Sequence, residues 1–181
     1  MKIYKVEFEV DEYKSLLASD DSVYQTDLLT LDGSSKSNEW KEPLSTELDN
    51  LGGKDPDIFG FNAGDMVLYG ESYKILNDYI NKDFELLPVQ WGSKKGFCIN
   101  PLILHNSIDS DNSTWCVDED SGKKLFLEEY VFDVTKVPDS FVFKDTLDCF
   151  ELFTTDQEGS LKIITEKSNL KGLSFELLHE S

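Results

Sequence analysis

Apolar and charged residues alternate near the start of the chain, which is the pattern of a strand with one buried face. In residues 2–10, the side chains of Tyr4, Val6, Phe8 and Val10 recur at every second position, with lysines and glutamates between them. We therefore predict a half-buried strand at this place, with these four side chains on its inner face.

The middle of the chain predicts one short strand and one hairpin. The uninterrupted apolar run 66–69 is typical of a short buried strand. Further on, two apolar runs, 84–91 and 97–104, flank a five-residue segment that begins and ends with glycine. This arrangement predicts an antiparallel hairpin with alternating burial.

More strands are predicted in the last third of the chain. In 124–134 the alternation places Phe126, Tyr130, Phe132 and Val134 on one face. The remaining strands are expected at 141–143, at 150–154 paired with 160–165 across a turn at 156–159, and at 173–178. The polar segment 105–122 is expected to be a loop.

Helical periodicity is confined to two segments. In 71–80, Tyr73, Leu76 and Ile80 form one apolar stripe, so this is predicted to be the one main helix. A short C-terminal helix is predicted at 166–171, where Thr165 serves as the N-cap and Gly172 as the left-handed stop.

These elements indicate an α+β fold with a mostly antiparallel sheet. Residues 11–57 are rich in turn signals, such as Gly33 and the Asp55-Pro56-Asp57 segment, and their pattern is less regular. We therefore expect 1–57 to form an N-terminal strand and an acidic extension, packed on a body formed by 58–181.

The charge of the chain narrows the choice of partners. The 181 residues carry 36 acids and 17 bases, a net charge of −19, and every base is lysine. Arginine is the usual fork for phosphate groups, and an acidic surface repels a phosphate backbone, so nucleic acid is not an expected partner. A basic protein would instead be attracted and steered toward the surface.

The location expected from the sequence is the cytoplasm. No apolar run reaches the ~18 residues that a membrane helix needs, so no membrane partner is expected. The first residues alternate and carry charge, unlike a signal peptide. Three widely spaced cysteines, Cys98, Cys116 and Cys149, are a poor disulfide framework.

The sequence predicts no enzyme, and no catalytic, cofactor-binding or metal-binding residues are assigned. Only His105 and His179 are available as imidazole bases, and a Cys98–His105 pair lacks an orienting third group. Glycine pairs such as Gly52-Gly53 neither follow a predicted strand nor open a helix, so they form no phosphate loop.

Calcium is the one metal that the sequence raises as a question. Asp109, Asp111, Ser113 and Asp120 stand at positions 1, 3, 5 and 12 of a calcium-type loop. However, Thr114 stands where such a loop requires glycine, and a bidentate glutamate is missing. The alternative is an ordinary solvated acidic loop.

One segment stands out as a candidate protein-binding surface. Between Gly96 and Gly122 the chain has no lysine, while five acids lie near Trp115. An aromatic side chain among carboxylates suits docking on a basic surface. The aromatic ring is buried in the partner and stabilises the complex, and the acids orient the partner as it approaches. The candidate residues are Asp109, Asp111, Trp115, Asp118, Glu119, Asp120, Glu128 and Glu129. The competing interpretation is that Trp115 packs inward.

The order of several short pieces resembles the immunity protein 11 family of bacterial polymorphic toxin systems. The pieces are Trp40 with Pro43, Asp57-Ile58, Met66-Val67-Leu68-Tyr69, the 73–76 helix, Glu85-Leu86-Leu87-Pro88-Val89, Ile99-Asn100-Pro101, Ile108-Asp109 with Ser113, Leu152-Phe153, Ile163-Ile164-Thr165-Glu166 and the closing segment 172–178.

The resemblance implies a non-enzymatic protein that binds and neutralises a cognate toxin domain. An acidic immunity protein suits a basic toxin, such as a nuclease with a positive cleft. The alternative is an acidic mimic or regulator of a basic nucleic-acid-binding protein outside toxin systems, and an enzyme of another class is a third possibility. Pro88, Asn100 and Gly172 are expected to be structural.

Overall fold

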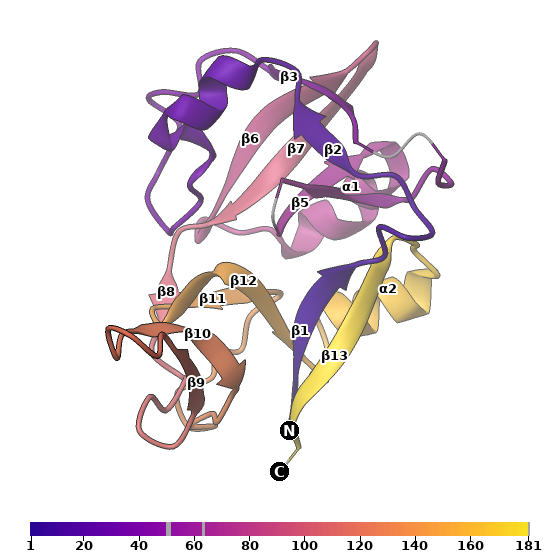
Figure 1. The fold of residues 1–181 in the computed structure, drawn as a ribbon. Coiled ribbons are helices and arrows are strands. Elements are labelled where there is room, and N and C mark those ends of the chain that lie inside the picture. The colour runs from indigo at the N-terminus through magenta and orange to yellow at the C-terminus, as the bar shows by residue number, and fades with distance from the viewer. Residues whose placement is uncertain (50–51, 63, 181) are drawn as a thin grey trace.

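The computed structural model describes residues 1–49, 52–62 and 64–180 of the chain. Figure 1 shows two layered parts, with a β-barrel above and an open sheet below, and the two termini side by side at the end of the open sheet. The α+β expectation is confirmed in that strands dominate and helices are few and short.

The barrel is formed by six strands of the described chain, which hydrogen-bond in the closed order β2-β3-β6-β7-β5-β4. The β3–β6 and β2–β4 pairs are parallel and the other pairs are antiparallel. The strands are β2 (Leu16–Ala18), β3 (Leu44–Leu48), β4 (Ile58–Phe61), β5 (Asp65–Tyr69), β6 (Phe84–Trp91) and β7 (Lys94–Pro101).

The open sheet has the order β13-β1-β12-β11-β8, in which only the β11–β8 pair is parallel. Its strands are β1 (Lys2–Phe8), β8 (Leu104–His105), β11 (Phe143–Asp145), β12 (Asp148–Thr155) and β13 (Leu173–Glu180). A separate two-stranded hairpin of β9 (Thr114–Val117) and β10 (Lys124–Glu129) lies beside this sheet.

Short helices fill the space around the strands. Helix α1 (Gly70–Leu76) continues into the 3-10 turn η3 (Asn77–Tyr79), and α2 (Leu161–Ser168) precedes β13. Two further 3-10 turns, η1 (Asp21–Gln25) and η2 (Asp27–Leu29), lie between β2 and β3.

A central apolar core joins the barrel to the open sheet. On β5, Met66 and Leu68 face this core while Val67 and Tyr69 point into the barrel, so the whole strand is buried. The central core consists of Val6, Ile58, Met66, Leu68, Leu76, Phe84, Ile99, Phe141, Val142, Leu152, Leu161 and Ile164. Burial on both faces explains why the run 66–69 is apolar without interruption.

Two other cores complete the molecule. The barrel core consists of Leu16, Ala18, Leu31, Trp40, Phe59, Phe61, Val67, Tyr69, Leu87, Val89 and Cys98. The third core lies on the other face of the open sheet and consists of Ile3, Ile108, Leu127, Phe132, Phe143 and Phe153. It holds the β9–β10 hairpin against the sheet.

The predicted hairpin of 84–104 is confirmed, although its turn is tighter than expected. β6 and β7 pair from Phe84↔Pro101 to Trp91↔Lys94, which leaves Gly92 and Ser93 as the turn. Gly92 has φ of 57°, which suits a two-residue hairpin turn. Gly96 lies within β7, where an added Cβ would meet the Leu68 carbonyl oxygen at 2.5 Å.

The predictions for β1 and β10 were right about the strands and right in part about the buried faces, because Val6 and Phe132 are buried as predicted and Phe8 and Tyr130 pack against the same cores. On β1 the buried side chains are Ile3 and Val6, on opposite faces, and Val10 is exposed. On β10, Leu127 is buried and Phe126 is exposed, because the pairing with β9 shifts register on both sides of these residues.

The helix predictions need correction. There is no main helix at 71–80, because α1 ends at Leu76 and α2 is one residue longer than α1. The segment 160–165 is not a strand but the start of α2. There Ser160 caps the helix through Ile163 N–H. The helix ends before 171, at Asn169, which has φ of 55°.

The N-terminal 57 residues supply strands to both parts of the molecule. β1 is an inner strand of the open sheet, and β2 and β3 complete the barrel. The Glu85 carboxylate holds the loop between β2 and β3 in place, because it accepts hydrogen bonds from Lys36 N–H and Ser37 N–H. The segment expected as an extension therefore contributes strands β1, β2 and β3 to the open sheet and the barrel.

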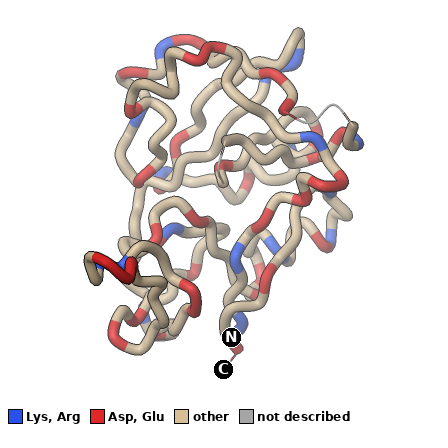
Figure 2. Tube along the Cα trace, viewed as in Figure 1, with Lys and Arg blue, Asp and Glu red and all other residues tan. Residues whose placement is uncertain are grey.

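Charged residues are spread over the whole trace, as Figure 2 shows. In the part of the chain that the structure describes, no helix is long and apolar enough to cross a membrane.

A buried carboxylate holds β8 and β11 together. Asp145 is fully buried, and its Oδ2 accepts hydrogen bonds from Ser107 N–H at 2.7 Å, Ser107 Oγ at 2.8 Å and Ile108 N–H at 3.1 Å. Its Oδ1 accepts from Leu147 N–H at 3.1 Å. Removing this carboxylate would leave several buried donors without an acceptor.

We predict that Asp145→Ala lowers the free energy of unfolding by about 3 kcal/mol. The exposed Asp139→Ala is the matched control and should change it by less than about 0.5 kcal/mol. Urea unfolding followed by circular dichroism measures both. Equal effects of the two substitutions would contradict the anchoring role of Asp145.

Candidate protein-binding site on the acidic hairpin

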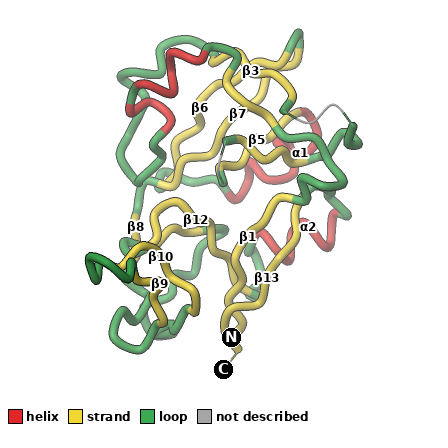
Figure 3. The backbone as a smooth tube through the Cα atoms, in the orientation of Figure 1, coloured by secondary structure: helices red, strands yellow, loops and turns green. Residues whose placement is uncertain are grey.

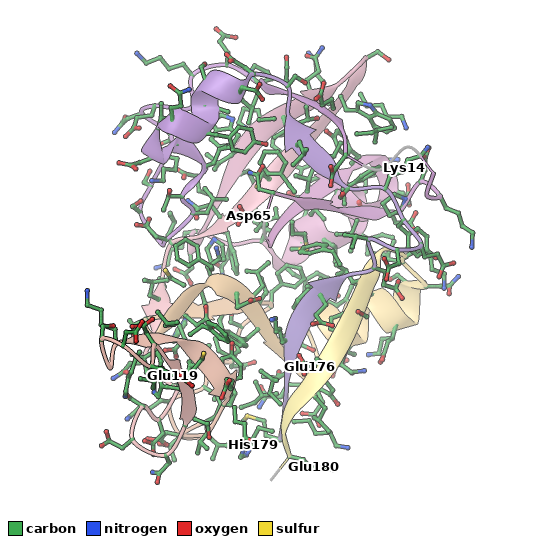
Figure 4. The ribbon with its side chains drawn as sticks, viewed as in Figure 1. Lys14, Asp65, Glu119, Glu176, His179 and Glu180 are labelled. Carbon is green, nitrogen blue, oxygen red and sulfur yellow. The ribbon has the colours of Figure 1, made fainter. Side chains whose placement is uncertain are left out.

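Most of the predicted partner-binding residues lie on the β9–β10 hairpin, beside the open sheet. We call residues 114–129 the acidic hairpin. Figure 3 shows its two strands beside the open sheet, joined by a loop. Asp118, Glu119 and Asp120 lie in the connecting turn, and Glu128 and Glu129 lie on β10. Glu119 is labelled in Figure 4.

The turn is ordered by hydrogen bonds to Asp118. Its carboxylate accepts from Ser121 N–H at 2.7 Å and from Ser121 Oγ at 2.5 Å, and its N–H donates to the Lys123 carbonyl. The hydrogen bonds from Ser121 lower the pKa of Asp118. Gly122, with φ of 69°, closes the turn. Asp118 therefore shapes the turn, and the exposed Glu119 and Asp120 are presented outward.

Exposed apolar side chains accompany these acids, and the sequence interpretation missed them. Leu125 and Phe126 are each 58% exposed, and Val117 is 45% exposed. Phe126 stands opposite Cys116 across the hairpin, on the face turned away from Leu127. Aromatic side chains are enriched at protein interfaces.

Trp115 packs inward, as the competing interpretation expected. Its ring lies against the third core, opposite Leu127, and its Nε1 donates to the Ser110 carbonyl at 3.3 Å. The Lys124 ammonium lies 4.6 Å from the ring centroid and covers it. Phe126, rather than Trp115, is therefore the strongly exposed aromatic side chain of the acidic hairpin.

Asp109 and Asp111 lie in a separate turn before β9. The Asp109 carboxylate accepts hydrogen bonds from Asp111 N–H, Asn112 N–H and Asn112 Nδ2, which lower its pKa. Strand β9 stands between this turn and Asp120. The calcium-type arrangement is therefore not formed. Across 1–49, 52–62 and 64–180, no group of three or more His, Cys, Asp or Glu side chains is placed to hold a metal ion.

The two groups considered for nucleophilic chemistry, Cys98 and His105, lie in different parts of the molecule. Cys98 is fully buried in the barrel core, where burial raises its pKa well above the usual value. His105 lies against Phe143 of the third core, with ring centroids 5.9 Å apart, and burial lowers its pKa. This arrangement supplies no activated thiolate.

Comparison with known proteins adds no family assignment: no protein-family model and no curated protein matches the chain. The resemblance to the immunity protein 11 family rests on the short sequence pieces given above.

The exposure of Phe126 and the burial of Leu127 make a direct test of the hairpin geometry. We predict that Leu127→Ala lowers the free energy of unfolding by about 3 kcal/mol, because it leaves a cavity beside Trp115. Phe126→Ala should change it by less than about 0.5 kcal/mol. Thermal or urea unfolding of both variants provides the measurement, and a larger loss for Phe126→Ala would refute this geometry.

Proposed function

We propose that this protein binds and neutralises a cognate bacterial toxin domain in the cytoplasm, and that it does so without enzymatic chemistry. The observation that carries the proposal is the exposed Phe126 on a hairpin that also bears five carboxylates. The partner surface that fits this arrangement is basic around an apolar recess.

Charge and apolar contact have different roles in such a complex. The net charge of −19 attracts a basic domain from a distance and raises the association rate. Phe126, once desolvated in a recess of the partner, sets the lifetime of the complex. The sequence resemblance to a family of toxin-binding proteins supports the same function.

We expect a toxin domain to be encoded beside the gene, and the experiment uses that domain. Co-expression of this chain should restore growth to cells that produce the toxin, and the purified proteins should form a complex. A chain that restores growth without forming a complex would contradict neutralisation by binding.

We predict that neutralising the five hairpin acids slows association and weakens its dependence on salt. The variant combines Asp118→Asn, Glu119→Gln, Asp120→Asn, Glu128→Gln and Glu129→Gln. The matched control removes five exposed acids elsewhere, Glu39, Glu42, Glu47, Asp78 and Asp139. Stopped-flow or surface-plasmon measurements at two salt concentrations compare the rates. If both variants associate equally fast, the hairpin is not the docking surface.

The substitution Phe126→Ala tests the apolar contribution of Phe126 to binding separately from the contribution of the hairpin acids. We expect faster dissociation and an affinity weaker by about tenfold or more, with an unchanged association rate. The matched control is Tyr79→Ala, which removes another exposed aromatic ring, 40% against 58% exposed, away from the hairpin. Unchanged dissociation of the Phe126 variant would exclude this side chain as the anchor.

A further inference from the structure

A cavity of about 470 Å³ lies where the barrel meets the open sheet. Its walls come from β2, the η1–η2 segment, Asn62, Gly64 and the strands β5, β11 and β12. Leu17, Leu29 and Leu31 make the walls apolar, and Tyr24 and Phe150 stand at its edge with 46% and 60% of their surface exposed. A cavity of this size with mostly apolar walls is typical of a small-ligand site.

An ion pair closes the base of this cavity. The Lys144 ammonium donates to the Leu31 carbonyl at 2.6 Å and to Asp65 Oδ1 at 3.5 Å. Only 1% of the Lys144 side chain is exposed, against 12% of the Asp65 side chain. The carboxylate is therefore the charged group that a ligand reaches, and the ammonium lies behind it.

The Asp65 carboxylate has few hydrogen-bond partners among the described side chains. Among the residues that the structure describes, Lys144 is its one side-chain partner, and that contact is long. Burial raises the pKa of Asp65 to about 6, although the Lys144 ammonium opposes the shift. A buried carboxylate normally accepts several hydrogen bonds, and a donor entering through the cavity would supply one.

The surroundings favour a cationic donor over an anionic ligand. The lining residues from segment 15–35 are uncharged, and the rest of that segment has four aspartates and no lysine, so its charge outside the lining is negative. An anion would meet Asp65 before it reached Lys144. The rings of Tyr24 and Phe150 at the edge of the cavity can make cation–π contacts with an entering cation, and the leucines can pack against an aliphatic stem.

We propose that this cavity binds an ammonium or guanidinium group carried on an aliphatic stem, with the cation at Asp65 and the stem against the leucines. The site is independent of the acidic hairpin and of the proposed toxin binding. The same chemistry is offered by a free alkyl amine and by a lysine or arginine side chain of another protein.

Three six-carbon probes test the chemistry on the unmodified protein. In titrations followed by amide chemical shifts, n-hexylammonium should bind saturably, with a dissociation constant on the order of 1 mM. Binding of 1-hexanol should be at least about tenfold weaker, and hexanoate should not bind at this place. Shift changes should centre on Leu17, Asp65 and Phe150. Binding of hexanoate as tight as that of n-hexylammonium would overturn the proposal.

Substitutions then test whether the Asp65 carboxylate is the group that binds the ligand cation. Asp65→Asn alone leaves Lys144 buried without its partner, so the test variant is Asp65→Asn with Lys144→Met, which replaces the ion pair by neutral groups. It should bind n-hexylammonium at least about tenfold more weakly than the parent. Asp78→Asn, an exposed carboxylate away from the cavity, is the control and should bind as the parent does. A folded double variant with parental affinity would overturn the assignment to Asp65.

A peptide pair identifies the source of the cation. An acetylated and amidated Gly-Lys-Gly peptide that binds through the same residues, while the norleucine analogue does not, supports a protein side chain as the ligand. Binding of n-hexylammonium without the lysyl peptide supports a free amine. Failure of all the cations to bind overturns the proposal and leaves the toxin-binding function unaffected.

Discussion

The apolar core between the barrel and the open sheet is the contact on which the rest of the structure depends. Strands β4 and β5 present Ile58, Met66 and Leu68 to this core, while their alternate residues fill the barrel. The open sheet contributes Val6 and Leu152 from the other side. Because these strands are covered on both faces, neither part buries its apolar residues without the other. The cavity and the hairpin are placed by this junction, one at its edge and one on the far face of the open sheet.

Buried polar groups fix the loops around these cores. Glu85 accepts hydrogen bonds from Lys36 N–H, Ser35 Oγ, Asn100 Nδ2 and Ser37 N–H. Burial alone would raise the pKa of Glu85, but these donors outweigh it and the pKa is lowered. Trp40 Nε1 donates to the Pro88 carbonyl at 2.8 Å, which ties the same loop to β6. The long connection between β2 and β3 is thereby held against the barrel, and its first part forms a wall of the cavity.

In the proposed complex, the acidic hairpin contributes two kinds of side chain to recognition. Glu119 and Asp120 are exposed at the turn and act at a distance, whereas Phe126 acts only on contact. Trp115 and Leu127 pack the hairpin against the third core. A surface that needs little rearrangement on binding favours a tight complex with a complementary basic domain.

The sequence by itself determined the elements whose pattern has one interpretation. The run 66–69, the hairpin from Phe84 to Pro101 and the closing strand β13 are where the pattern predicts them. The acidic character of the whole surface likewise follows from composition alone, because nearly all charges must stay in contact with water.

Tertiary structure decided the rest. Residues 161–165 satisfy both an alternating and a helical pattern, and the helix forms because Leu161, Ile164 and Thr165 fit one buried face and Ser160 caps it. Register shifts in the β9–β10 pairing decided that Leu127 is buried and Phe126 exposed. The Asp65–Lys144 pair joins residues 79 positions apart in the chain. Local pattern carries no information on which distant groups meet, since that depends on how the barrel and the sheet pack together.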